Sequence, residues 1–211
     1  LYDGWLVKKD NKYRIYDQIF YPLSDLEFDK VDANKSRAAI KYKSGWGIYN
    51  SNKDFPTTFD YDSVRFLSEQ IGIIIKGDST FAVFDNDLLL DISYSKETRL
   101  LRPTGLKSAE DDIYAQYLLT KNSRGVYKAF NIHGLEILDG KYSSVDALGH
   151  EYLVVERAGK KGLFHQSGTV ALKVKYSAIG NYDRGYVSTL LNGKFGIYNY
   201  KKKVLLSAKY G

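Results

Sequence analysis

The feature that most constrains this chain is an internal repeat of about 34 residues, marked by an aromatic residue and a short polar residue in succession. The marker pair occurs at Tyr16-Asp17, Tyr49-Asn50, Phe84-Asp85, Phe130-Asn131, Phe164-His165 and Tyr198-Asn199. Successive pairs are 33, 35, 46, 34 and 34 residues apart, so only the third interval departs. A repeat of this length indicates one small folding unit that buries its hydrophobic faces by stacking on its neighbours.

Further columns keep a fixed distance from the first residue of each pair, which we call the marker aromatic. The residue before it is always apolar: Ile15, Ile48, Val83, Ala129, Leu163 and Ile197. Twelve residues after it stands a corner aromatic: Phe28, Tyr61, Tyr142, Tyr176 and Tyr210. Fifteen residues after it stands an aliphatic residue: Val31, Val64, Val145 and Ile179. The third copy breaks both later columns, with Lys96 and Arg99 at these places.

Each copy predicts three short antiparallel strands. The first is an apolar run such as 152–155, and a hairpin turn follows it, most clearly at Asn192-Gly193, since Asn-Gly favours tight hairpins. The marker strand, such as 46–50, is apolar on both faces and is therefore expected in the middle of a sheet. Its glycine, Gly47 in that copy, is expected to make room for a large ring of a neighbour.

The fold class that follows is all-β, with six tandem three-stranded antiparallel units in a single array over residues 1–211. The units expected from the repeat are 1–34, 35–68, 69–112, 113–147, 148–182 and 183–211. They could close into a β-propeller-like ring or stack as an open β-solenoid. A solenoid needs polar terminal caps, and neither end of the sequence is clearly polar, so we favour the propeller-like arrangement.

These columns resemble the WG repeat family, also called KWG repeats, of bacterial tandem-repeat proteins. The residues that carry the resemblance are Gly45-Trp46-Gly47-Ile48-Tyr49-Asn50, Phe59-Asp60-Tyr61-Asp62-Ser63-Val64, Lys161-Gly162-Leu163-Phe164, Lys175-Tyr176-Ser177-Ala178-Ile179 and Gly193-Lys194-Phe195-Gly196-Ile197-Tyr198-Asn199. Only one copy has the literal Trp-Gly pair. The resemblance implies an exported or envelope protein that mediates interactions, and it carries over no catalytic residue.

Composition excludes several classes of function. The formal net charge is +6, from 31 Lys and Arg against 25 Asp and Glu, which is too mild to indicate a nucleic-acid partner. There is no cysteine, so disulfides and thiolate metal sites are excluded, and no apolar run is long enough to span a membrane. The chain begins at Leu1 and lacks Met, so we expect a processed product or an excised segment.

The sequence predicts no catalytic, cofactor or metal site. His133, His150 and His165 show no metal-ligand spacing, and His165 stands where other copies place Asp or Asn, which predicts a strand-end or turn residue. Residues 85–87 resemble the start of a calcium loop but lack its later glycine and glutamate, so a turn is expected. Residues 201–203, three lysines, are expected to form a solvated hairpin tip.

The irregular segment of the third copy, residues 96–112, is the candidate for function, since long loops on rigid scaffolds tend to carry it. We select Arg99, Arg102 and Tyr114 as candidate interaction residues. The alternative is an insertion that the fold merely tolerates. Most other aromatics stand in repeat columns, where core packing explains them.

The function expected from the sequence is therefore a non-catalytic repeat module for protein–protein interaction or scaffolding in a bacterial envelope or secreted assembly. A glycan- or peptidoglycan-binding module is the alternative. A protein partner is favoured, a glycan is possible, and no nucleic acid is expected. The family resemblance implies an exported, periplasmic or cell-surface location.

Overall fold

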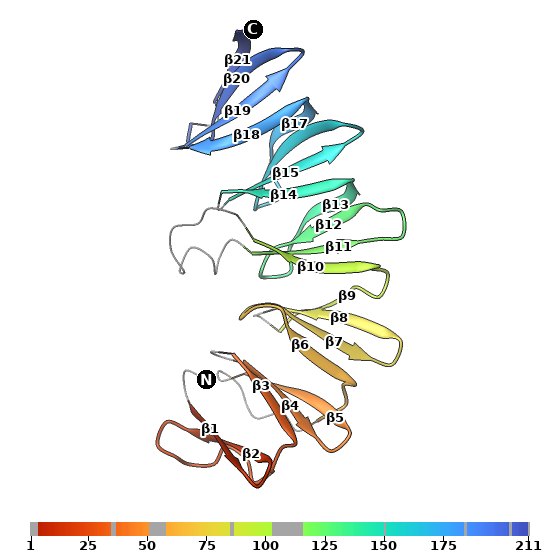
Figure 1. Ribbon diagram of the computed structural model, residues 1–211, viewed down its shortest axis with the longest axis vertical. Helices are drawn as coiled ribbons and strands as arrows, with labels where there is room; N and C mark the ends of the chain where they lie inside the picture. Colours follow the sequence, from red (N-terminus) through yellow and green to blue (C-terminus); the bar gives the residue numbers. More distant parts are fainter. Residues whose placement is uncertain are drawn as a thin grey trace. The chain divides into compact units, whose positions relative to one another are not determined.

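All secondary structure that the computed structural model describes is β-strand (Figure 1). The described residues are 4–34, 37–50, 58–84, 87–102, 116–149, 151–183, 185–202 and 204–210. None of them lies in a helix, so no helix of the described chain could cross a membrane. The all-β class expected from the sequence is confirmed.

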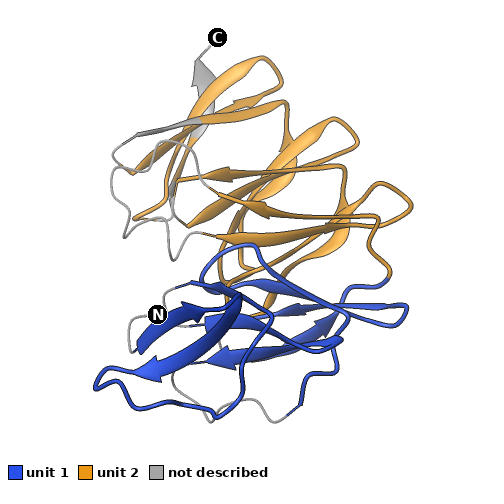
Figure 2. Cartoon of the chain, turned by 60° about the horizontal axis from the view of Figure 1, so that its bottom comes forward, with its two compact units in different colours: residues 1–93 blue, residues 94–211 orange. Residues whose placement is uncertain are grey.

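The chain divides into two compact units, residues 1–93 and 94–211 (Figure 2). The first unit contains β1 (Gly4–Lys9), β2 (Lys12–Asp17), β3 (Lys30–Ala33), β4 (Arg37–Tyr42), β5 (Gly45–Asn50), β6 (Ser63–Phe66), β7 (Gly72–Lys76), β8 (Ser79–Val83) and β9 (Leu89–Asp91). The second contains β10 (Glu97–Leu101), β11 (Tyr117–Lys121), β12 (Tyr127–Phe130), β13 (Glu136–Tyr142), β14 (Ser144–Leu148), β15 (Tyr152–Arg157), β16 (Lys160–His165), β17 (Val170–Tyr176), β18 (Ala178–Asp183), β19 (Tyr186–Leu191), β20 (Lys194–Asn199) and β21 (Val204–Tyr210).

Most sheets contain four strands, where the sequence predicted three. The sheets of the described residues are β1–β2, β3–β4–β5, β6–β7–β8–β9, β10–β11–β12–β13, β14–β15–β16–β17 and β18–β19–β20–β21, all antiparallel and in sequence order. The strand missed from the sequence directly follows the corner aromatic, and it is the first strand of the next sheet. The aliphatic column that includes Val31 and Val145 lies on these first strands.

The same backbone hydrogen bond recurs at each junction between consecutive sheets. The residue after the corner position donates its N–H to a carbonyl near the end of the next sheet's second strand. The bonds are Asp29 to Lys41 at 2.8 Å, Asp62 to Ile75 at 2.9 Å, Lys96 to Lys121 at 2.8 Å, Ser143 to Glu156 at 2.8 Å and Ser177 to Leu190 at 2.9 Å. We call this the corner hydrogen bond. It places each first strand beside its second strand.

The third copy is regular at its corner, which corrects the sequence alignment. Its corner hydrogen bond comes from Lys96, so Ser95 and not Lys96 occupies the position of the corner aromatic. Thr98 pairs with Thr120 as Val145 pairs with Val155. The marker of this copy is displaced as well: Phe84 donates its N–H to the Leu88 carbonyl as His165 does to that of Thr169, so Val83 occupies the marker position and the corner again follows twelve residues later.

The extra residues of the third copy lie between β10 and β11. This connection spans 102–116, whereas the equivalent connections in other sheets span 67–71 and 149–151. The segment predicted to be irregular, 96–112, therefore begins with an ordinary strand, β10. Residues 103–115 lie outside the described part of the chain.

Neighbouring sheets within each unit share hydrophobic cores. One core joins Tyr142 of β13 to Phe164 of β16, and another joins Tyr176 of β17 to Tyr198 of β20. In the first unit, equivalent cores join β2 to β4 and β4 to β7. The marker strands β8, β12, β16 and β20 lie inside four-stranded sheets, as their two apolar faces predicted, but β2 and β5 each stand at the end of a sheet among the described strands. Whether the array closes as a propeller or stays open as a solenoid remains a prediction.

Glycine in the marker strand permits close approach of a neighbouring side chain. A Cβ added at Gly47 would lie 3.0 Å from the Phe59 ring, which confirms the expected role at that position. At Gly162 the neighbour is aliphatic, because an added Cβ would lie 2.7 Å from Cγ2 of Val174. The space left by glycine is therefore used in both units.

We predict that Gly162→Ala lowers the free energy of unfolding by about 1–3 kcal/mol, the usual cost of overpacking a core. Gly180→Ala is the matched control, because a Cβ there would meet no described atom within 4 Å. Urea unfolding followed by circular dichroism measures both. Equal stability of the two variants would contradict the packing role of Gly162.

Candidate ligand-binding pocket

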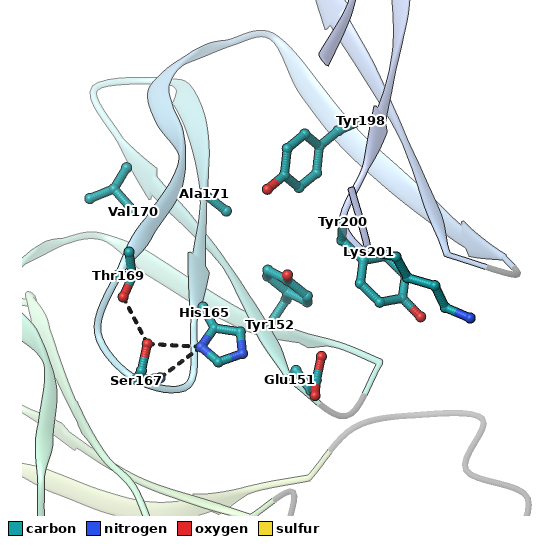
Figure 3. Close-up of a pocket in the computed structure, with 10 residues that line it drawn as sticks. All are labelled: Glu151, Tyr152, His165, Ser167, Thr169, Val170, Ala171, Tyr198, Tyr200 and Lys201. Carbon is teal, nitrogen blue, oxygen red and sulfur yellow. Dashed lines mark hydrogen bonds between the residues drawn. The ribbon is translucent and has the colours of Figure 1, made fainter. Parts of the chain in front are cut away.

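A pocket of about 870 Å³ lies where the sheets β14–β17 and β18–β21 meet (Figure 3). It opens at the end of the sheets that carries the turns after the marker strands. Its lining residues combine aromatic, hydroxyl and charged side chains: Glu151, Tyr152, His165, Ser167, Thr169, Val170, Ala171, Tyr198, Tyr200 and Lys201. All belong to the second unit.

The turn after β16 brings His165, Ser167 and Thr169 together. In other copies the polar marker residue closes this turn with its side chain, as Asn131 Oδ1 does by accepting N–H groups from His133 and Leu135 at 3.0 and 2.9 Å. His165 Nδ1 performs the same role and accepts the backbone N–H of Ser167 at 3.2 Å. The turn role predicted for His165 is therefore confirmed.

Two hydroxyl groups extend this turn into a short chain of hydrogen bonds. Ser167 Oγ lies 2.8 Å from His165 Nδ1 and 2.8 Å from Thr169 Oγ1. Because Nδ1 accepts the backbone N–H, the neutral ring carries its proton on Nε2. The imidazole can therefore donate one hydrogen bond to a ligand. The contact of Ser167 with His165 follows from the turn and does not by itself indicate a nucleophile and its base.

Tyrosine rings form the apolar part of the pocket. Tyr152 is 4% exposed and packs edge-to-face on His165 and on Tyr200, with ring centres 5.3 and 5.5 Å apart. Burial, with smaller contributions from Tyr198 and Glu151, raises the pKa of Tyr152 to about 12. Burial also raises the pKa of Tyr198. Both phenols therefore stay neutral over the physiological range.

The remaining polar groups come from loops at the same end of the two sheets. Glu151 precedes β15, and its carbonyl accepts the backbone N–H of Gln166 at 2.7 Å, which ties this loop to the turn after β16. Lys201 follows β20 and is exposed. The pocket thus offers ring faces, hydroxyl groups, one carboxylate and one ammonium group.

The residues selected from the sequence lie elsewhere. Arg99 is on β10, where its guanidinium lies 5.8 Å from the ring centre of Tyr127 and its Nε lies 3.5 Å from Glu97 Oε1. Arg102 is exposed at the end of β10. Tyr114 lies outside the described residues. The sequence offered no reason to select Tyr152 or Tyr200, and Lys201 was expected only at a solvated hairpin tip. The one available signal was His165, at a position usually occupied by Asp or Asn.

The other sequence candidates form no metal site in the described chain. No group of three or more His, Asp or Glu residues that could hold a metal ion occurs among the described residues. Of the calcium-like run, positions 85 and 86 lie outside the described part. Asp91 Oδ1 accepts the backbone N–H of Ser93 at 2.8 Å, and the pKa of Asp91 is lowered by that bond and by the Ser93 hydroxyl.

Comparisons with known proteins name no family. No protein-family model matches the chain, and neither does a curated protein. Similar solved structures include a eukaryotic initiation factor, at 10% identity and a TM-score of 0.40 over 94% of this chain and 60% of that one. PorZ, a surface component of the type-IX secretion system of Porphyromonas gingivalis, is similar at 7% identity and a TM-score of 0.29, over 93% of this chain and 29% of that one.

The N-terminal domain of Nup159 is a third, at 12% identity and a TM-score of 0.32, over 80% of this chain and 57% of that one. The chain spans less than two thirds of the length of each of these three structures. At these TM-scores the similarities carry no argument about what the chain does.

We predict that Tyr152 makes the protein less stable in alkali. Below pH 10 the phenol is protonated in both the folded and the unfolded chain, so Tyr152 adds no pH dependence. Between pH 10 and about 12 only the unfolded chain ionises at this residue, so the free energy of unfolding falls. Urea unfolding across this range should show a smaller fall for Tyr152→Phe. An identical fall in both proteins would contradict the raised pKa.

Proposed function

We propose that this chain is a non-catalytic interaction module of the WG repeat kind, which binds a protein partner in a bacterial envelope or secreted assembly. The observation that carries the proposal is the pocket between the sheets β14–β17 and β18–β21. It is large enough for several side chains of a peptide, and aromatic residues with few charged groups are typical of interaction sites. The bacterial and exported setting rests on the family resemblance alone.

The chemistry of the pocket fits a short peptide segment that carries an aromatic or aliphatic side chain. Tyrosine rings offer large contact area at low entropic cost, and His165 and Ser167 can bond to peptide amides. Glu151 and Lys201 add opposite charges, which fix the orientation of a bound peptide more than they raise its affinity. Tyr152, His165 and Tyr198 stand on strands, whereas Glu151, Ser167 and Lys201 stand on the loops beside them.

A glycan is the second candidate ligand, and the same pocket supports it. Tyr200 is partly exposed beside the buried Tyr152, and a ring of this kind can stack on the apolar face of a sugar. The hydroxyl groups of Ser167 and Thr169 and the carboxylate of Glu151 could bond to sugar hydroxyls. A peptide is favoured because it can offer a carboxylate to the ammonium group of Lys201, whereas a neutral sugar carries no charge.

We predict that peptides selected from a random phage-displayed library against the whole chain lose at least tenfold in affinity when Tyr200 is changed to Ala. His165→Asn should weaken binding without unfolding the turn, because Asn closes the same turn at Asn131. Leu135→Lys is a control for general surface effects, since Leu135 is 53% exposed and does not line the pocket. Calorimetry measures the affinities.

A glycan array probed with the same proteins separates the two ligand classes. Binding of glycans but not peptides, with the same loss in Tyr200→Ala, would replace the protein partner by a glycan. Peptide binding that Tyr200→Ala and His165→Asn leave unchanged would contradict a role for the pocket. Failure to bind either class would contradict the proposed function.

The segment around Arg102 and Tyr114 is the other candidate for the partner-binding site, and a separate variant tests it. Replacing residues 102–116 by the three-residue sequence 149–151 restores the loop length of the β14–β15 connection. We predict that the selected peptides bind this variant with unchanged affinity, because the pocket is made by other sheets. A loss of binding with intact folding would move the partner site to this segment.

A further inference from the structure

Within the described residues, the first sheet has no counterpart of the first strand that every later sheet possesses. β1 precedes the marker strand β2, so it corresponds to the second strand of the other sheets. Its counterparts β4, β7, β11, β15 and β19 each pair with a strand on both sides. Among the described strands, β1 pairs with β2 alone (Figure 1). One edge of β1 is therefore open in the described chain.

The five complete junctions share one register. The residue three positions after the corner position pairs with a fixed residue of the second strand. The pairs are Val31 with Ile40, Val64 with Ile74, Thr98 with Thr120, Val145 with Val155, and Ile179 with Thr189. The second-strand members are 0, 1, 1, 0 and 2% exposed in this order.

Val7 occupies the equivalent position on β1. It pairs with Arg14, two residues before the marker aromatic, as Ile40 pairs with Gly47 and Val155 pairs with Gly162. Yet Val7 is 41% exposed, and its neighbours Trp5 and Leu6 are 51 and 40% exposed. These three apolar residues are open to solvent where their counterparts are covered.

We propose that the open edge of β1 accepts a further antiparallel strand, supplied by a repeat unit of this same kind outside residues 1–211. The incoming strand places a β-branched residue opposite Val7. The residue before that strand donates its N–H to the carbonyl of Lys8, which follows Val7 as Lys41 follows Ile40. Strand addition of this kind derives its affinity from main-chain hydrogen bonds.

The chemistry of the incoming segment can be read from the junctions within the chain. At two junctions the residue after the corner position is an Asp, and its carboxylate accepts the N–H of the first turn residue of the next sheet's hairpin. Asp29 Oδ2 accepts from Lys43 at 2.8 Å, and Asp62 Oδ2 accepts from Gly77 at 2.6 Å. On β1 the corresponding N–H belongs to Asp10. Lys8 and Lys9 lie at the same end of β1, so their charges favour an acidic residue directly after the corner position of the incoming segment.

Other occupants fit less well. The first strands β3, β6, β10, β14 and β18 each pair with their own second strand, so none of them could serve β1 without breaking a sheet. A second copy that offered its own β1 would bring two further lysines to the edge, and lysine on an edge strand opposes such pairing. The first strand of another repeat brings no such penalty.

A synthetic peptide with the sequence of residues 60–66, Asp-Tyr-Asp-Ser-Val-Arg-Phe, tests the proposal on the whole chain. We expect saturable binding with a blue shift of Trp5 fluorescence and slower hydrogen exchange of residues 4–9. Val7→Lys should weaken binding at least tenfold, and Leu135→Lys should leave it unchanged. The same peptide with Pro in place of Val64 cannot complete the ladder and should not bind.

Two results with the unfused chain would overturn the proposal. One is equal binding of a scrambled peptide, since the edge would then be unselective. The other is a concentration-dependent dimer that protects residues 4–9 without peptide, because the occupant would then be a second copy. To exclude weak affinity as a cause of failure, the peptide is also fused before Leu1 through a Gly-Ser linker, which raises its effective concentration to the millimolar range. Unprotected residues 4–9 in that fusion would likewise overturn the proposal.

This inference is independent of the proposed function. β1 belongs to the first unit and the pocket to the second, so Val7→Lys should leave binding to the pocket intact, and Tyr200→Ala should leave strand binding at β1 intact.

Discussion

The corner hydrogen bond is the interaction on which the other features of this array depend. It holds the start of every first strand to the next sheet's second strand, and it recurs with nearly the same length at all five junctions. Because side chains alternate between the two faces of a strand, a shift of one residue would turn the aliphatic column away from the core. The bond persists in the third copy, where Ser95 replaces the corner aromatic, so the backbone contact and not the ring defines the junction.

The sequence predicted the elements whose residues are buried in every copy. Marker strands carry apolar residues on both faces, and this pattern correctly placed β8, β12, β16 and β20 inside sheets, whereas β2 and β5 stand at the ends of their sheets among the described strands. The first strands were missed because they are short and follow the corner without a turn signal, so the sequence alone could not assign them to the next sheet. The third copy was misaligned for a simpler reason. Counting from Phe84 placed the corner one residue late, because Val83, which is not aromatic, occupies the marker position in the structure.

The pocket was harder to predict than the fold, because it requires two sheets to meet. Tyr198 is a marker aromatic and Tyr152 begins the apolar run 152–155, so both were expected in the core, where both are indeed buried. They become part of a site only because loop residues such as Glu151, Ser167 and Lys201, which come from different copies, lie around them. His165 was the one residue whose departure from its column could be noticed in the sequence. Its imidazole keeps the turn while adding an aromatic ring and a donor that an ionised Asp lacks.

The two ends of the sheets are under different constraints, and this difference explains where variation occurs. The corner end holds the register of every junction, so a change there would disturb two sheets at once. The opposite end carries the marker turns and the connections between first and second strands. In the second unit, the long connection 102–116 and the pocket loop with Glu151 both belong to this end, since Leu101 pairs with Tyr117 and Leu148 with Tyr152. Residues at that end can change without loss of register, which makes it the end on which a repeat array can evolve a binding site.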